Sequence, residues 1–381
     1  MKSKMSERWV GVAAGMAAIV TLVWSGIVVV TSRPSAPGSG DDTQTQTAPV
    51  GSAEGRVYET ILGATDADAF GDDWYVLDAR SNLVHHLAAD GTLVDSFGGE
   101  GRGPGEMQGP EAIVIHHDTV VVAESMGGVV HLYGLDGSFI ADRRIGAEDC
   151  AISLVIDLVT TPAGLAVLLG CFDHPMAPSA KVVLEREGST SVLADLSAQH
   201  SDRGVDPFFS PVVAAHLDGV LAGVAGSDCL AVYDFFGRVS EEICHEWISR
   251  VVPSEADQQA LDVLSEQASA IGFDLDVYDR LPGFDRVFVD PAGRVVYRGV
   301  AGGIPEQFRA VTERPLGQEE ALPIPLAEYL FVRGDRVLLG WDELDGTRLS
   351  VRSWRPWWIR TGGGHSEGIA RSGPLSHGFL A

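Results

Sequence analysis

The sequence predicts an all-β fold, a six-bladed β-propeller with one inserted helix, preceded by an N-terminal transmembrane helix. Three observations support this expectation: a repeat of strand-like segments with a period of 46 residues, six tight turns at comparable points of that repeat, and one long uncharged apolar run near the N-terminus. A period in the forties with strand content is typical of propeller blades.

The repeat is clearest between DARSNLVHHLAADGTLV (residues 78–94) and ESMGGVVHLYGLDGSFI (residues 124–140). At the constant offset of 46 residues, an acidic residue matches an acidic residue, His85 matches His131, and one Asp-Gly dipeptide matches another. Later segments keep the order of apolar strand, turn and apolar strand. The two segments therefore predict two consecutive blades.

The number of blades follows from turns between the first and second strand of each repeat. We expect these turns near Asp72, Asp118, Gly164, Gly219, Gly293 and Gly334. The segment RVYETIL (residues 56–62) is expected to supply the outer strand of the last blade and so close the ring. The sequence thus predicts one propeller domain over residues 55–360.

One segment departs from the strand pattern, PSEADQQALDVLSEQASAI, within residues 253–272. Ser254 is a suitable N-cap, and Ala256, Ala260, Leu261, Leu264 and Ile271 fall on one helical face. We expect a single amphipathic helix inserted between the fourth and fifth blades.

The N-terminus predicts location. Residues 1–8 carry Lys2, Lys4 and Arg8, and roughly 22 apolar residues then give about 33 Å of helix, enough to cross a bilayer. We expect residues 9–31 to form an uncleaved anchor and residues 1–8 to be cytoplasmic, which leaves the rest extracytoplasmic, or periplasmic in a cell with an outer membrane. A cleaved signal peptide is the alternative, although no clean A-x-A site follows.

Two segments have too little apolar surface to fold. Residues 32–54 are rich in serine, proline, glycine and threonine and are expected to be a flexible linker. Residues 361–381 are expected to be a disordered tail for the same reason. The chain carries a net charge of −26, which makes nucleic acid a poor partner and leaves cationic partners open.

All four cysteines follow the predicted anchor, where the compartment is oxidising. Cys229 and Cys244 flank the turn DFFGR, and a disulfide there would close a loop of about 15 residues. Cys150 and Cys171 bracket the turn TTPAG in a similar way. A metal site is less favoured, because no C-x-x-C or H-x₃-H pairing accompanies these residues.

These features together resemble a known family. The repeat, the segment GRGPGE (residues 101–106), the helical insertion and a last blade of GDRVLLGWDELDGTRLSV (residues 334–351) are similar to bacterial six-bladed β-propellers related to NHL-repeat proteins. The resemblance covers about residues 55–360 and implies a binding platform. The sequence departs from the NHL pattern between residues 124 and 130, where no Asn or Arg is present.

The glycine-rich segment at residues 98–110 is the most distinctive loop. Its glycines have no G-x-G-x-x-G register and no G-K-[ST] follows, so it does not predict a phosphate site. It should connect one blade to the next on the face that also carries the second-to-third-strand turns. We expect this face to bind the ligand, through Arg102, Glu106, Glu111, Arg80, Glu124, Arg298 and Asp342. Alternatively, glycine only permits a tight crossover, and Arg102 and Glu106 pair with each other or with neighbouring blades.

The expected function is a binding or scaffold module for a protein, peptide or glycan, with no catalytic residue assigned. The alternative is a calcium-dependent hydrolase of the lactonase or esterase type, because related propellers hold calcium with Glu, Asp and Asn ligands. The chain has one asparagine, Asn82, so only an all-carboxylate site remains open, with Glu111 and one of Asp157, Asp285 or Glu328. Calcium is the one cofactor left open.

Two other signals are weaker. The motif GHSEG (residues 364–368) lies in the tail without the strand-to-helix elbow that a nucleophilic serine needs. His116 and His117 are adjacent on a predicted strand and are expected to point to opposite faces, so they should not form a metal pair.

Overall fold

The computed structural model describes residues 55–174, 177–196, 211–224, 229–244, 258–259, 262, 266, 284–289, 294–301, 304–312, 318–321, 329–333, 336–343 and 346–353. The predicted cytoplasmic segment, anchor, linker and tail lie outside these residues. No helix among the described residues is long and apolar enough to cross a membrane.

The described strands form six antiparallel sheets of four strands each. The first sheet holds β2 (Ala64–Phe70), β3 (Asp73–Asp78), β4 (Leu83–Leu87) and β5 (Leu93–Gly98). The second holds β6 (Pro110–His116), β7 (Thr119–Glu124), β8 (Val129–Gly134) and β9 (Phe139–Arg144), and the third β10 (Ser153–Thr161), β11 (Gly164–His174), β12 (Ala177–Arg186) and β13 (Ser189–Asp195).

The fourth sheet holds β14 (Pro211–His216), β15 (Gly219–Val224), β16 (Cys229–Tyr233) and β17 (Val239–Cys244). The fifth holds β18 (Phe284–Val289), β19 (Val295–Ala301), β20 (Ile304–Thr312) and β21 (Gln318–Ala321). The sixth holds β22 (Tyr329–Arg333), β23 (Arg336–Glu343), β24 (Gly346–Ser353) and β1 (Arg56–Tyr58).

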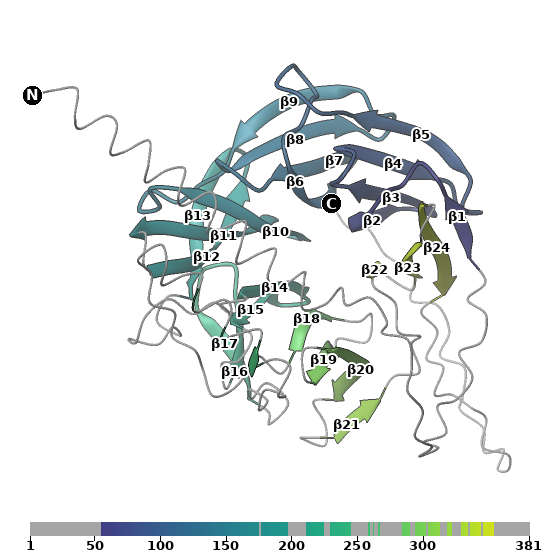
Figure 1. Ribbon diagram of the computed structural model, residues 1–381. Coiled ribbons are helices and arrows are strands. Elements are labelled where there is room, and N and C mark those ends of the chain that lie inside the picture. Colours follow the sequence, from purple (N-terminus) through teal and green to yellow (C-terminus); the bar gives the residue numbers. More distant parts are fainter. Residues whose placement is uncertain are drawn as a thin grey trace, which may run out of the picture.

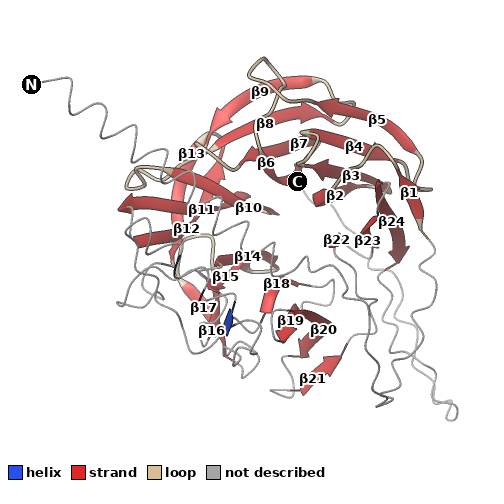
Figure 2. Ribbon diagram, in the orientation of Figure 1, coloured by secondary structure: helices blue, strands red, loops and turns tan. Residues whose placement is uncertain are grey.

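The sheets stand around a common centre, with the first strand of each sheet innermost (Figure 1). Strand β6 contacts both β2 and β10, β14 contacts both β10 and β18, and β22 contacts β2. Figure 2 shows that strands make up nearly all of the described regular structure. This radial arrangement of antiparallel four-stranded meanders is that of a β-propeller.

The N-terminal strand completes the last sheet, as the sequence predicts. Strand β1 pairs antiparallel with β24, with Arg56 opposite Leu349. Side chains of the sixth sheet also reach the first sheet: Arg333 Nε lies 3.3 Å from Asp68, and Arg336 donates to the backbone oxygen of Asp72. The sixth sheet is therefore joined to the N-terminal end of the chain by a strand pair and to the first sheet by contacts of arginine side chains.

The core lies between neighbouring sheets. Val121, Val130 and Leu132 of the second sheet pack in one buried cluster with Leu165 and Val167 of the third. The β-branched and aliphatic residues that predict strands also supply these faces, because a strand buried on both sides presents apolar side chains in both directions.

The Asp-Gly turn between β8 and β9 packs against the preceding sheet. Gly137 has a φ of 78° in the turn between β8 and β9, and a Cβ there would lie 2.7 Å from the ring of Phe97 on β5. The Tyr75 hydroxyl of the first sheet donates to the backbone oxygen of Leu135 at 2.8 Å in the same turn. The repeat therefore reflects contacts between sheets as well as the local need for glycine.

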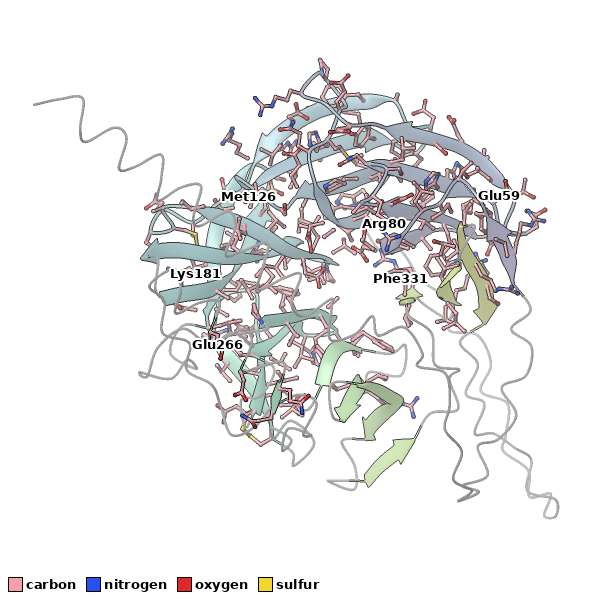
Figure 3. The ribbon with its side chains drawn as sticks, in the orientation of Figure 1. Glu59, Arg80, Met126, Lys181, Glu266 and Phe331 are labelled. Carbon is pink, nitrogen blue, oxygen red and sulfur yellow. A yellow bond between two sulfur atoms is a disulfide. The ribbon has the colours of Figure 1, made fainter. Side chains whose placement is uncertain are left out.

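Both cysteine pairs expected from the sequence form disulfides, Cys150–Cys171 and Cys229–Cys244 (Figure 3). Cys229 lies directly opposite Cys244 in the pairing of β16 with β17. Cys150 lies before β10 and reaches Cys171 on β11.

Little of the expected helical insertion lies within the described residues. Gln258, Gln259, Asp262 and Glu266 are helical and exposed. Three of them are spaced four residues apart, which is the spacing of one polar helical face.

Candidate functional site at the mouth of the channel

The direction of the strands places two kinds of loop on one face. These are the connections that enter β2, β6 and β10 and the turns between the second and third strands. We call this the loop face, defined by residues 59–63, 79–82, 99–109, 125–128 and 145–152. The innermost strands begin at this face, so their first residues line the mouth of the central channel.

The glycine-rich connection on the loop face is held by Asn82. The Asn82 backbone oxygen accepts from the N–H of Gly99 at 2.7 Å, and its side-chain Oδ1 accepts from the N–H of Gly109 at 3.1 Å. Met107, in the middle of the connection, is fully buried and donates its N–H to the Gly99 oxygen at 2.7 Å. The connection is thus anchored at both ends and at its centre.

Arg102 and Glu106 bond within their own loop. Arg102 Nε donates to Gln108 Oε1 at 3.0 Å, and Glu106 Oε2 accepts from the N–H of Gly103 at 2.7 Å. Both side chains are exposed. Among the described residues they bond neither each other nor a neighbouring sheet, so this part of the alternative interpretation is wrong.

Glu124, at the end of β7, binds the glycine-rich connection through its carboxylate. Its Oε1 accepts from the N–H of Gln108 at 2.5 Å and lies 3.1 Å from His131 Nε2. The other ring nitrogen of His131 lies 2.7 Å from Asp142 Oδ1. A buried histidine between two carboxylates therefore ties the second sheet to the connection that enters it.

The first sheet repeats this arrangement 46 residues earlier. Asp78 Oδ2 accepts from the N–H of Leu62 at 2.7 Å and lies 3.7 Å from His85 Nε2, and His85 Nδ1 lies 2.8 Å from Ser96 Oγ. Asp78, His85 and Ser96 follow one another in the order acid, histidine and serine, which is the order of contacts in a catalytic triad. In the second sheet the residue equivalent to Ser96 is Asp142, which cannot act as a serine nucleophile. The role that the two sheets share is therefore structural support.

Of the remaining predicted binding residues, the structure describes the side chain of Arg80. Arg80 is exposed and donates to the backbone oxygen of Leu62 at 2.9 Å, and its guanidinium covers Gly63 (Figure 3). Arg298 and Asp342 lie on β19 and β23, and their side chains are outside the described part of the structure.

Carboxylates farther along the channel have backbone partners. Asp66 Oδ2 accepts from the N–H of Ile113, and Asp68 Oδ2 accepts from the N–H of Ile115, each at 2.7 Å. Burial raises the pKa of Asp68, which the Arg333 guanidinium and the N–H groups of Ile115 and Ala69 partly offset. The aspartates of β2 thus satisfy the exposed edge of β6 and bind the two innermost strands together.

Glu111 is the exception among these carboxylates. It is half-buried, and its side chain has no hydrogen-bond partner among the described residues. Burial, and then the nearby Asp157, raise its pKa to about 7. The carboxyl of Asp157 on β10 is engaged with the N–H of Leu158 at 2.7 Å.

A β-bulge sets the position of Glu111. Pro110 pairs with Glu124 and Ala112 with Ala123, which leaves Glu111 without an opposite residue. Strands β2, β10 and β18 have register shifts at the same point. A bulge at the start of an innermost strand redirects a side chain, here at the mouth of the channel.

His116 and His117, at the end of β6 away from the loop face, do not point to opposite faces as predicted. His117 has a φ of 55° in the turn after β6, so its ring lies 4.3 Å from the ring of His116 and does not point away from it. Burial, and then His117, lower the pKa of His116, whose Nδ1 lies 2.9 Å from Thr160 Oγ1. No group of three His, Cys, Asp or Glu side chains suited to a metal occurs in the described ranges.

The alternative prediction was an all-carboxylate calcium site, and the structure describes the side chains of two of its four candidate ligands. Glu111 and Asp157 approach from the adjacent strands β6 and β10. The side chain of Asp285 and the whole of Glu328 lie outside the described residues. Carboxylate oxygens are suitable calcium ligands, so the two residues fit a part of such a site.

No protein-family model matches the chain, and no curated protein matches its sequence. Among solved structures, it is similar to a protein of Bacteroides fragilis assigned as exported, with 10% identity over 77% of this chain and 92% of the other and a TM-score of 0.48. It is similar to regucalcin, a calcium-binding protein of Agrobacterium tumefaciens, with 14% identity, the same coverages and a TM-score of 0.44.

Virginiamycin B lyase of Staphylococcus aureus shares 10% identity over 74% of this chain and 79% of its own, with a TM-score of 0.42. Likenesses at this level carry no argument about activity. The propeller fold of this chain is assigned from its own sheet topology.

Two residues of the site were missed by the sequence reasoning. Asn82 was not among the predicted site residues, yet it holds both ends of the glycine-rich connection. Gln108 joins Arg102 to Glu124 through its side chain and its N–H. Leu62 and Gln108 are separated by the repeat offset, and that spacing is the signal that could have indicated the shared N–H contact.

Proposed function

We propose that this chain is a membrane-anchored, extracytoplasmic six-bladed β-propeller that binds a protein, peptide or glycan at the mouth of its channel. The six sheets, the closing strand β1 and the two disulfides support an exported propeller. The apolar run at residues 9–31 supports the anchor.

Glu111 carries the proposal for the site. A carboxyl group with a pKa of about 7 is present in both forms at neutral pH, so it can donate to a ligand oxygen or accept from a ligand N–H or O–H. Groups with strongly shifted pKa values at the mouth of a channel are frequent in functional sites. Glycan hydroxyls and peptide amides supply the matching donors and acceptors.

The other predicted residues take two roles in this proposal. Arg102 and Glu106 are exposed on a loop that is held in place, so they are available at the rim, as is Arg80. Glu124 acts through the loop, since its carboxylate is bonded to Gln108 and faces His131. Arg298 on β19 and Asp342 on β23 are included in the proposal on the position of their strands alone.

The test compares the purified full chain with its Glu111→Gln variant on immobilised glycan and peptide arrays. The matched control is Glu241→Gln, which changes an exposed glutamate on the outer strand β17. We expect ligands that bind wild type and the control to lose at least about tenfold in affinity with Glu111→Gln, or about 1.4 kcal/mol. Equal binding by all three proteins would refute the site.

A second candidate is a calcium-dependent hydrolase, favoured by the approach of Glu111 to Asp157. Bound calcium would supply Lewis-acid chemistry to a carbonyl or ester group, and the two carboxylates would hold it. Calcium at 100 times its dissociation constant should stabilise the fold by about 2.7 kcal/mol. Thermal unfolding with calcium or chelator decides this, because an unchanged midpoint in wild type would exclude the calcium-dependent function.

A further inference from the structure

The third sheet ends in an outer strand, and no strand of the described part of the chain lies beyond it. In the order β10-β11-β12-β13, β12 is the one described strand that pairs with β13. Its first four residues, Ser189, Thr190, Ser191 and Val192, are all exposed. A terminal strand presents unpaired backbone N–H and C=O groups along its outer edge, which is a template for pairing with another chain.

This exposed stretch carries no charge, and the one charged residue of β13 is Asp195 at the end of the strand. The exposed parts of four other outer strands carry charge, with Arg56 on β1, Asp95 on β5, Asp142, Arg143 and Arg144 on β9, and Glu241 and Glu242 on β17. Charged side chains on an edge strand oppose pairing with another strand. The start of β13 lacks this protection.

Exposed apolar side chains lie beside the same edge. Val192 is 47% exposed, and Phe236 and Val239 of the fourth sheet are 80% and 51% exposed. They are neighbours, because a Cβ on Gly237, between Phe236 and Val239 in sequence, would lie 3.4 Å from the backbone oxygen of Val192. Pairing at this edge would remove part of this apolar area from water.

We propose that β13 pairs with β13 of a second copy of this chain, in an antiparallel arrangement about a two-fold axis. With the axis at Thr190, Thr190 lies opposite Thr190 of the partner subunit, and Ser189 lies opposite Ser191 of the partner subunit. Pairs of hydroxyl side chains such as these are favourable across strands. The two third sheets then form one continuous sheet of eight strands.

A second copy is the occupant that the charge pattern favours. Self-pairing of β17 would bring Glu241 and Glu242 of both copies together, and self-pairing of β9 would do the same with Arg143 and Arg144. Self-pairing at residues 189–192 brings no like charges into contact. The net charge of −26 on each copy still opposes association at a distance, and salt screens that repulsion.

The experiment is sedimentation of the full chain in density-matched detergent over a range of protein concentrations. We expect a reversible monomer–dimer equilibrium whose association constant rises as salt increases from about 0.05 to about 0.5 M. Thr190→Lys should weaken association at least tenfold, since it puts like charges across the two-fold axis. The matched control Val94→Lys adds the same charge to the exposed, outer strand β5 and should leave association unchanged.

Hydrogen exchange locates the contact independently of the variants. Among residues 189–192, the N–H groups on the outer edge should become protected as the concentration of wild type rises, because those on the other edge already face β12. The other outer strands should show no such change. A chain that remains monomeric at every concentration and salt would overturn the proposal. It would equally be overturned by a dimer that persists in Thr190→Lys or by protection confined to another segment, such as the predicted anchor.

Discussion

The backbone N–H of Gln108 donates to the carboxylate of Glu124 at 2.5 Å, and this contact connects the second sheet to the loop that precedes it. The equivalent contact in the first sheet joins Leu62 to Asp78 at 2.7 Å, at an offset of 46 residues for both partners. An acidic residue at the end of the second strand therefore holds the entry to the first strand of its own sheet. In the first two sheets, a hydrogen bond from the loop face to the second strand thus holds the loop in position.

Replacement of Glu124 by alanine should destabilise the fold. It leaves the N–H of Gln108 without its acceptor and removes the carboxylate that lies 3.1 Å from His131 Nε2, which together cost about 1–3 kcal/mol. Urea unfolding of the variant and of wild type measures this difference. Glu241→Ala removes an exposed glutamate and should change stability by no more than about 0.5 kcal/mol. Equal effects of the two changes would show that the contact contributes nothing.

Replacement of Gly137 by alanine should cost more than the same change at Gly71. Both glycines have positive φ, 78° and 60°, so both variants carry the backbone strain of about 1–2 kcal/mol. Only at Gly137 would the new Cβ meet a neighbour, the ring of Phe97 at 2.7 Å, whereas Gly71 has open space. Thermal unfolding should rank wild type above Gly71→Ala and Gly71→Ala above Gly137→Ala. The reverse order of the two variants would contradict the packing of this turn.

The titration of Glu111 predicts a pH dependence of stability. Its pKa is raised to about 7 from 4.5, so the native state disfavours the charged form. The stability that the neutral carboxyl retains is fully present below pH 4.5 and is lost as the pH rises through 7. Glu111→Gln should therefore gain about 3 kcal/mol relative to wild type between pH 4.5 and pH 8. Urea unfolding at both values checks this, and parallel curves for the two proteins would contradict the shift.

Removal of either disulfide should destabilise the oxidised protein by about 3 kcal/mol, because the two bonds close loops of similar length, with sequence separations of 15 and 21 residues. The double variants Cys229→Ser/Cys244→Ser and Cys150→Ser/Cys171→Ser are compared with wild type by urea unfolding. Wild type treated with reductant is the control and should lose both contributions. A variant as stable as oxidised wild type would show that its bond adds nothing.

The sequence predicted the features that depend on local pattern. The offset between His85 and His131, and the Asp-Gly turns that follow them, indicated equivalent positions in two sheets, and both histidines are buried. The symmetric flanking of a turn by Cys229 and Cys244 indicated their pairing. Such features are encoded by strand alternation and turn chemistry, which act over a few residues.

The partners of loop side chains could not be predicted in the same way. Glu106 bonds to the N–H of Gly103, and Asn82 reaches Gly99 and Gly109 across the face of the first sheet. These contacts depend on how the loop folds back over a neighbouring turn, which no short-range pattern specifies. Strand alternation predicted that His116 and His117 point to opposite faces, but the positive φ of His117 in the turn brings the two imidazole rings together.

The most direct test of the proposed site is the affinity of a ligand from the arrays as a function of pH. If Glu111 contacts that ligand, the affinity of the full chain should change through an apparent pKa of about 7, and Glu111→Gln should lose both the affinity and this pH dependence. Glu241→Gln should behave as wild type. Unchanged affinity and unchanged pH dependence in Glu111→Gln would contradict a ligand site at the mouth of the channel.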